Sequence, residues 1–515
     1  MRALTASAIR AKGERAIAEA LRDLPKGRAC DAIRGVLEEE GAALGGAMGV
    51  AVTGIVSSGK STLVNALIGG DLLATGYHAM TFVSAVLRYA EALEILESGK
   101  PITRDELLAR SGRKADGSHA DTSGFEVRGP WPYLRWFDLV DTPGFDSAFD
   151  EDTVQAMAAF GLTAEKIRER TFSDLVRADA VVTVLNHANL SQEEAAMLSR
   201  FHTGEDDRPP LSPVTCLGVL TKLEDQWRPA DPELDPLAVG ERHVRRLMAQ
   251  PEAARLFYKV VPVCSMVGAT AATLTEEDFT DLVSLTDAPP ETVLSALKSR
   301  AHFARADLPV AADRRAALLA RFTPYGVHLA CGLLRNGATT PAALREELDR
   351  RSGLPGLRSL LVRHFGRRRD LIKVARVVAR AHALTAGLPG DPRDRRAAQV
   401  ALRHVTDLAR DDQDLIELDL LARWYEGKLT LPDGIAEEFR RAAGEEGTSV
   451  AERLGLAPGT PLADLEKAAC ARLGVWRASP LLSPDAVPIV QVLERRYELL
   501  CDRVRTARSL LEDGP

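Results

Sequence analysis

The sequence is short of cysteine pairs, lysine, long apolar runs and net positive charge, and most of these shortages exclude a class of protein. Its six cysteines are scattered without a Cys-x-x-Cys pair or histidines at ligand spacing, which disfavours a zinc site and favours a reduced cytoplasm. No stretch approaches 18 consecutive apolar residues, and the amphipathic first 24 residues lack a signal peptide's apolar centre. We therefore expect a cytoplasmic chain that neither spans a membrane nor is secreted by the usual route.

Charge gives the chain no general attraction for polyanions. The formal net charge is −7, and only 12 of the 66 basic residues are lysine, a bias that we attribute to base composition. No nucleic-acid partner is expected, and any basic patch must be local.

What the sequence does contain is enough apolar material for two or three folded domains in its 515 residues. Amphipathic helical spacing fills residues 1–44. From 45 to 270, short β-rich runs alternate with helical stretches, which predicts a mostly parallel α/β sheet with helices on both faces. From 271 to 515 strand signals almost vanish, and an all-α assembly is predicted.

Two smaller features of this organisation are also predicted. The first and last helices each carry an apolar stripe that needs a partner, so we expect the two ends of the chain to pack together. The stretch 98–129, rich in glycine, serine, arginine and aspartate, looks like a surface insertion.

The strongest chemical signal is Gly54-Ile55-Val56-Ser57-Ser58-Gly59-Lys60-Ser61, which fits the phosphate-binding P-loop pattern completely. An apolar strand precedes it and a helix beginning at Thr62 follows, so helix amides and the helix dipole would face the phosphates. Lys60 would neutralise phosphate oxygens, and the Ser61 hydroxyl would bind Mg²⁺. The alternative is a flexible Gly/Ser turn.

A second motif, Asp141-Thr142-Pro143-Gly144, follows an apolar strand. Its carboxylate would lie at the strand's carboxyl end, where Mg²⁺ needs an indirect contact, and the Gly144 amide would sense the terminal phosphate. Without a P-loop upstream, the same four residues would be an ordinary turn.

A third motif occupies the place of a base-reading loop. Thr221-Lys222-Leu223-Glu224 follows a strand, and the carboxylate that would accept guanine hydrogens is Glu224 instead of the shorter aspartate. The alternative is a solvated loop. Ser265 ends the last strand, where a backbone loop would stack on the base.

With these motifs in order, the sequence resembles the dynamin superfamily of large GTPases, particularly bacterial dynamin-like proteins. The resemblance covers about residues 45–270 and is most specific in GIVSSGKSTLVNALIG, LVDTPGF and ADAVVTVL. In the helical half, RFTPYGV and RRSGL look like the shorter actinobacterial, isoniazid-induced type.

The resemblance implies site residues and partners. Thr81 would be the first switch threonine that closes over Mg²⁺, and Ser57 would approach a monovalent cation, K⁺ or Na⁺. GTP and GDP would be held by these residues: Gly54, Ser57, Ser58, Gly59, Lys60, Ser61, Thr62, Asp141, Thr221, Lys222, Glu224 and Ser265. Ser57, Lys60, Thr81 and Gly144 would serve hydrolysis, and Ser61, Thr81 and Asp141 the metal. The family also implies self-association through the GTPase face.

Two features depart from the family. Glu224 replaces the expected aspartate, and the stalk tip expected near 384–396 has no hydrophobic membrane paddle. The helix before that tip carries a basic run over 367–380, for which two readings stay open, docking on anionic lipid or a solvated helix face.

The sequence therefore predicts a Mg²⁺-dependent GTPase that couples hydrolysis to a helical neck and stalk, with the N-terminal helices packed on the neck. It would act in the cytoplasm, peripherally at the inner face of the cell membrane. One alternative is a weakly hydrolysing nucleotide-binding partner of a second dynamin-like protein, and another is an ATPase on the same scaffold.

Overall fold

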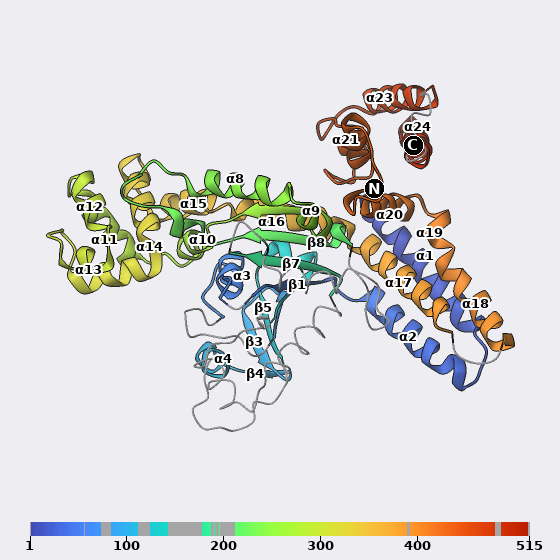
Figure 1. Ribbon diagram of the computed structural model, residues 1–515, viewed down its shortest axis with the longest axis horizontal. Coiled ribbons are helices and arrows are strands. Elements are labelled where there is room, and N and C mark those ends of the chain that lie inside the picture. The colour runs from blue at the N-terminus through green and yellow to red at the C-terminus, as the bar shows by residue number, and fades with distance from the viewer. Residues whose placement is uncertain are drawn as a thin grey trace.

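The computed structural model describes residues 2–55, 57–73, 84–111, 124–142, 178–186, 190, 195, 212–388, 392–478 and 486–512. Its centre is a nine-stranded sheet with strand order β4-β3-β5-β2-β6-β1-β7-β8-β9 (Figure 1). The strands are β1 (Gly49–Thr53), β2 (Ala85–Tyr89), β3 (Glu94–Glu97), β4 (Lys100–Pro101), β5 (Phe125–Gly129), β6 (Asp138–Asp141), β7 (Ala180–Leu185), β8 (Cys216–Leu220) and β9 (Lys259–Pro262).

The centre of the sheet is parallel from β6 through β1, β7 and β8 to β9, and β2 joins β6 in the antiparallel direction. The carboxyl ends of five neighbouring strands therefore meet at one edge of the sheet. Beyond β2 the sheet continues into β5 and β3. The prediction that 98–129 is a surface insertion is wrong at its end, because Phe125 and Val127 alternate into the core from β5.

Helices cover both faces of this sheet, as predicted. Val50 and Val52 on β1 belong to an apolar cluster with α3 (Lys60–Ile68) and α16 (Leu354–His364). Ala51, which points to the opposite face, belongs to a second cluster with α8 (Pro236–Met248) and α9 (Pro251–Leu256). The alternation along one strand buries both faces, which is typical of a parallel sheet.

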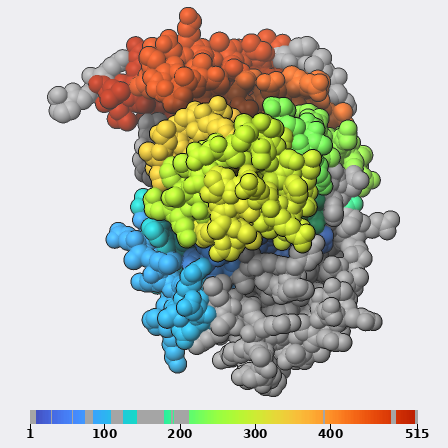
Figure 2. Space-filling model, turned by 90° about the vertical axis from the view of Figure 1, so that its left-hand side faces the viewer, coloured from blue at the N-terminus to red at the C-terminus, as the bar shows by residue number. Residues whose placement is uncertain are grey.

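The second cluster continues past residue 270 into a helical lobe. The lobe is α10 (Ser265–Ala272), α11 (Glu276–Thr286), α12 (Pro290–Ala296), α13 (Arg300–Arg305) and α14 (Ala312–Arg335). Figure 2 shows it facing the viewer in yellow and green, below the orange C-terminal helices. The predicted boundary near 270 is therefore not a break in the core, since Phe303 and Phe322 share a cluster with β7 and β8.

Helix α14 is the one described helix that is long and apolar enough to cross a membrane by length and composition. It kinks at Thr323, whose φ of 62° and ψ of 166° precede Pro324. Its buried residues, including Leu318 and Phe322, pack in the lobe's apolar cluster, as in the core helix of a folded domain.

The remaining helices form two groups. One contains α1 (Arg2–Asp23), α2 (Arg28–Gly45), α17 (Arg369–Ala386) and α18 (Pro392–Thr406) around a common apolar core. The other contains α20 (Gln413–Tyr425), α21 (Asp433–Ala442), α22 (Val450–Arg453), α23 (Leu462–Arg477) and α24 (Ala486–Glu512). Helices α15 (Pro341–Ser352) and α19 (Leu408–Asp411) are connecting elements, and α4 (Arg104–Ser111) follows β4. The short 3₁₀ helices are η1 (Pro132–Arg135), η2 (Pro213–Thr215), η3 (Leu223–Gln226) and η4 (Gly366–Arg368).

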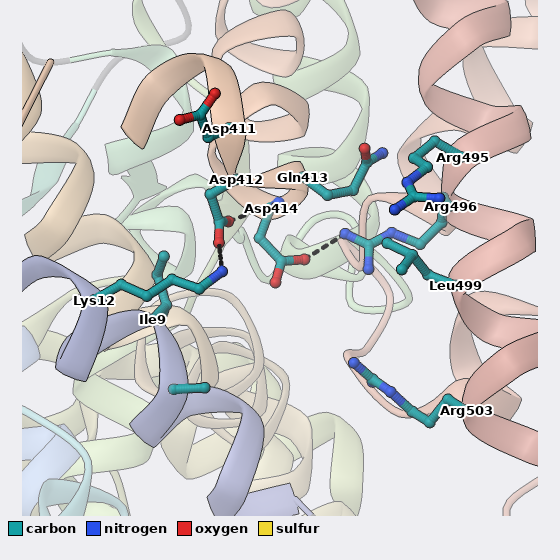
Figure 3. A pocket seen from close by; sticks show the side chains of 11 residues that line it. Ile9, Lys12, Asp411, Asp412, Gln413, Asp414, Arg495, Arg496, Leu499 and Arg503 are labelled. Atoms are coloured by element: carbon teal, nitrogen blue, oxygen red, sulfur yellow. Dashed lines mark hydrogen bonds and ion pairs between the residues drawn. The ribbon is translucent and has the colours of Figure 1, made fainter. Parts of the chain in front are cut away.

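The prediction that the first and last helices pack together is wrong in its main point. The apolar stripe of α1 faces α17 and α18, whereas that of α24 faces α20, α21 and α23, so each stripe has its own partners. Residues of both helices line a cavity of about 340 Å³ beside α20 (Figure 3) and a second one of about 540 Å³ beside α22. At the first cavity, Lys12 of α1 pairs with Asp412 at 2.6 Å, and Arg496 of α24 pairs with Asp414.

The basic run on η4 and α17 fits neither reading made from the sequence. Arg368 and Lys373 are buried, and Arg376 forms ion pairs with Glu40 of α2 and Asp179 beside β7. Lys373, for example, donates to the carbonyl oxygens of Gly46 and Ala47, between α2 and β1. The run is therefore structural for these residues, neither a lipid-docking surface nor a solvated face.

Candidate nucleotide-binding site

The turn between β1 and α3 has the backbone that a phosphate cradle needs. Gly54 has a φ of 151°, and a Cβ built there would lie 2.5 Å from the Val184 carbonyl oxygen and 2.8 Å from the Ser58 Oγ. Gly59 has a φ of 100° directly before the helix, and Ser57 has a φ of 61°. Side chains are excluded at Gly54 by contact, which leaves backbone amides and small hydroxyls to line the turn.

Lys60 is held inside this turn. Its side chain is largely buried, and Nζ donates to the carbonyl oxygens of Gly54 at 3.0 Å and Ile55 at 2.8 Å. These carbonyls hold the ammonium inside the turn, where its positive charge can attract an anion.

The Ser61 hydroxyl lies 3.3 Å from Asp141 Oδ2, so the first turn of α3 meets the end of β6. Asp141 is fully buried, and its Oδ1 has no hydrogen-bond partner within the described part of the chain. Burial raises the pKa of Asp141 to about 6, although the Lys60 ammonium acts in the opposite direction. Next to it, the Thr142 hydroxyl donates to the Val52 carbonyl and anchors the strand end.

The third motif lies on the same edge, after β8. Thr221 Oγ1 contacts the carbonyl oxygens of Ser58 at 2.7 Å and Leu185 at 3.1 Å, which ties this loop to the cradle. Lys222 has a φ of 57°, and Glu224 follows it in η3. No local pattern predicts the contact between Thr221 and Ser58, because it joins residues 163 positions apart.

Glu224 points inward. Its Oε1 accepts the Met266 amide at 2.8 Å at the start of α10, beside the buried Ser265, and its Oε2 has no partner among the residues described. Burial raises the pKa of this carboxyl to about 7. A base-reading role for Glu224 stays a prediction, with one oxygen engaged and one unpartnered.

The structure thus brings most of the predicted site residues to one edge: the turn at 54–62, Asp141, the loop at 221–224 and Ser265. Thr81 and Gly144 lie outside the described residues, as does Val56. Most of the buried oxygens that lack partners in the described chain also gather at this edge, namely Thr53 Oγ1, Ser58 Oγ, Asp141 Oδ1, Thr183 Oγ1, Asn186 Oδ1 and Glu224 Oε2. Buried polar atoms normally find partners, so such a group marks a place where a ligand supplies them.

These residues fit a nucleoside triphosphate with Mg²⁺. The cradle excludes side chains and carries a buried ammonium, which suits phosphate. Asp141 Oδ1, which has no partner within the described residues, and the nearby Ser61 hydroxyl are the oxygen ligands that Mg²⁺ prefers, directly or through its water.

A link that sequence analysis missed joins this site to the helices. Asp179 Oδ2 accepts the Gly49 amide at 2.9 Å, at the start of β1, and Asp179 Oδ1 pairs with Arg376 of α17 at 2.8 Å. Arg376 also pairs with Glu40 of α2 at 3.0 Å. The strand that leads into the cradle is therefore connected to two helices through one carboxylate. The sequence shows only a charged residue before an apolar strand.

Comparison with known proteins gives a family for the same region. Residues 50–223 match the model of the dynamin family. Isoniazid-induced protein IniC of Mycobacterium tuberculosis is 29% identical over 484 residues, covering 90% of this chain and 92% of that protein. Dynamin-like protein 2 of Campylobacter jejuni is 34% identical over 113 residues, 21% of this chain and 18% of that protein.

Among solved structures, an oligomerised bacterial dynamin pair, described as a mechanism for the long-range sensing and tethering of membranes, matches 97% of this chain and 91% of its own. The identity is 14% and the TM-score 0.31. A likeness of that degree supports no conclusion about this chain's activity or partners.

Proposed function

Residues 50–223 make this chain a member of the dynamin family. From that premise we propose that it binds GTP with Mg²⁺, hydrolyses it to GDP and phosphate, and couples this cycle to movement of its helices. The observation that carries this proposal is the cradle at Gly54–Ser61 with Lys60 buried in it and Asp141 beside Ser61. Three independent segments converge there on chemistry that suits a triphosphate.

The protein would act mostly by positioning the reacting groups and stabilising charge, because phosphoryl transfer requires little covalent chemistry from protein side chains. Lys60 and the amides of the turn would hold the β- and γ-phosphates and stabilise the charge that develops on them. Ser57 would help to compensate that charge, with a monovalent cation in the family's manner. Asp141 would orient the metal's water shell from the end of β6.

A bound Mg²⁺ would supply positive charge that offsets the charge of the phosphates. Ser61 would contribute its hydroxyl, and we propose that Thr81 completes the ligand set. The Gly144 amide would sense the terminal phosphate. These last two roles rest on the family motif alone.

Hydrolysis would reach the helices through Asp179. This carboxylate contacts the first residue of β1 and the Arg376 guanidinium. Because Arg376 of α17 also pairs with Glu40 of α2, a shift of β1 would be transmitted to both helices. We expect Asp179→Asn to leave GTP affinity within about threefold of wild type. Hydrogen exchange in α2 and α17 should then no longer respond to GTP. A nucleotide response in these helices equal to that of wild type would contradict this route.

Self-association through the nucleotide edge and peripheral action at the cytoplasmic face of an anionic membrane are proposed on family membership alone. The basic run at 367–380 lends little support to lipid binding, because Arg368 and Lys373 are buried and Arg376 is paired inside the molecule. Cosedimentation with anionic liposomes would test the membrane proposal directly.

One observation favours a second candidate, a weakly hydrolysing nucleotide-binding partner of another dynamin-like chain. One carboxylate oxygen of Glu224 already accepts a hydrogen bond from the Met266 amide, which would weaken the binding of guanine by this side chain. Phosphate release by the isolated chain separates the two candidates, since robust solitary turnover excludes the second.

The primary test is Lys60→Ala, with the exposed Lys298→Ala as its matched control. Removing the buried ammonium should abolish both GTP binding and phosphate release, a loss of at least about 100-fold in keeping with a charge that acts in a partly dry site. The control should behave as wild type. Unchanged turnover in Lys60→Ala would end the GTPase proposal.

A further inference from the structure

The last two helices, α23 and α24, bring two cysteines into contact that the sequence separates by 31 positions. Cys470 Sγ of α23 lies 3.3 Å from Cys501 Sγ of α24. Both are free thiols, and the other four cysteines are buried elsewhere in the fold. Because spacing alone shows no Cys-x-x-Cys pair, sequence analysis treated all six as isolated.

The contact is fixed by the way the two helices pair. They run antiparallel, with Glu466 opposite Arg505 at 3.1 Å and Arg477 opposite Glu494 at 3.1 Å. Cys470 and Cys501 lie between these ion pairs in the same register. The sulfur atoms are therefore held opposite each other by contacts on both sides.

The two thiols differ in access. Cys470 is half-buried, and Arg505 Nη2 lies 3.5 Å from its sulfur. Cys501 is buried, and burial together with its contact to Cys470 raises its pKa to about 12. The half-buried Cys470 is therefore the sulfur that an oxidant can reach, whereas the buried Cys501 is placed to react with Cys470.

We propose that Cys470 and Cys501 are a peroxide-reactive pair that forms a reversible disulfide between α23 and α24. Cys470 is the attacking residue and Cys501 the resolving one. This assignment is independent of the GTPase proposal, because both residues lie in the apolar cluster of the C-terminal helices and not on the sheet.

The chemistry balances with a hydroperoxide as the oxidant. The Cys470 thiolate attacks one peroxide oxygen, so an S–O bond forms, the O–O bond breaks and hydroxide leaves to take up a proton as water. The Cys501 sulfur then attacks Cys470, so the S–S bond forms and the S–O bond breaks. The Cys501 proton goes to the leaving oxygen as a second water, and two electrons have passed from the thiols to the peroxide.

The consequence of the bond would be a locked C-terminal hairpin. Arg496 and Tyr497 on the same helix α24 already contact Glu417 of α20 and Glu438 of α21. A covalent bond at Cys501 would therefore tie α23 through α24 to the rest of this helical group.

The test uses the full-length chain, purified reduced and treated with hydrogen peroxide, followed by non-reducing peptide mapping by mass spectrometry. We expect a linked pair of peptides that contain Cys470 and Cys501, lost again on treatment with dithiothreitol. Absence of this pair, or linkage between chains in place of it, would overturn the proposal without touching the nucleotide site.

Variants then test the order of attack. In Cys501→Ser the sulfenic acid at Cys470 has no resolving thiol, so dimedone labelling of Cys470 should rise several-fold over wild type. In Cys470→Ser the buried Cys501 should stay unlabelled, and the matched control Cys331→Ser should form the linked pair as wild type does. Labelling at Cys501 in place of Cys470 would contradict the assignment.

Discussion

Carboxylates are buried in two regions, at the edge of the sheet where the strands end and at the junction of α20, α22 and α24. The two regions differ in whether the buried carboxylate oxygens have partners. At the sheet edge, Asp141 and Glu224 each keep one buried oxygen without a partner in the described chain. At the helical junction, Glu417 receives Arg496 at 2.6 Å and Arg453 at 3.2 Å, with all three side chains at least nine-tenths buried.

The pKa values of the buried carboxyls also differ between the two regions. Burial raises the pKa of Asp141 to about 6 and that of Glu224 to about 7. Burial would also raise the pKa of Asp414, but the guanidiniums of Arg496 and Arg453 hold it well below its ordinary value. Unpaired buried oxygens therefore mark the binding edge, and fully paired ones mark architecture.

The largest effect is expected from breaking the helical junction. Glu417→Ala leaves the Arg453 and Arg496 guanidiniums buried with less compensation, which should lower the free energy of unfolding by about 3–5 kcal/mol. Urea unfolding measures this, with the exposed Glu437→Ala as control. GTP affinity of the folded variant should be unchanged, and a loss below about 1 kcal/mol would contradict the distinction between the regions.

The opposite change is expected at the sheet edge. Asp141→Asn should remove a buried charge whose desolvation the Lys60 ammonium offsets only in part, so the nucleotide-free protein should gain up to about 3 kcal/mol. The same variant should lose Mg²⁺-dependent GTP binding by at least about tenfold. Thermal unfolding without nucleotide and GTP titration with Mg²⁺ check the two halves, and a variant that is less stable and binds normally would contradict both.

The pH dependence of that gain follows from the raised pKa. In the unfolded chain Asp141 ionises near 3.8, whereas in the folded chain it stays neutral until about pH 6. Its neutral form therefore favours folding below pH 3.8, and this contribution is lost as the pH rises through 6. The stability difference between Asp141→Asn and wild type should be largest at pH 8 and vanish near pH 4. A difference that does not change with pH would contradict the burial of an unpaired carboxyl.

A smaller effect is expected from Glu224→Gln. The amide keeps the contact to the Met266 nitrogen but cannot accept two guanine hydrogens, so preference for GTP over ATP should fall by about tenfold. Competition titration of the two nucleotides measures this, with the exposed neighbour Asp225→Asn as control. An unchanged preference would remove Glu224 from base reading.

The sequence predicted the fold where local signals are strong. The β-rich runs predicted within 45–270 correspond to β1, β2 and β6 to β9. The P-loop pattern placed Gly54, Gly59 and Lys60 in one turn. The sequence also predicted that Ser61 and Asp141 serve one metal ion, a role that stays a prediction, and the two side chains lie 3.3 Å apart.

What the sequence could not predict depends on contacts between distant residues. Arg376 meets Asp179 across 197 positions, and Cys470 meets Cys501 only because α23 and α24 pair in one register. Strand β5, which lies between β3 and β2, was missed because it is short and follows a polar stretch. The inward turn of Glu224 depends on where α10 begins, which no local pattern fixes.

The central claim is that unpaired oxygens and a buried lysine at the sheet edge hold a magnesium–nucleotide. The most direct measurement is calorimetric titration of the purified chain with GTP, with Mg²⁺ and with a chelator. The account predicts saturable binding with Mg²⁺ that weakens strongly without it and disappears in Lys60→Ala. Equal heat signals for wild type and Lys60→Ala, or no uptake of GTP at all with Mg²⁺ present, would contradict it.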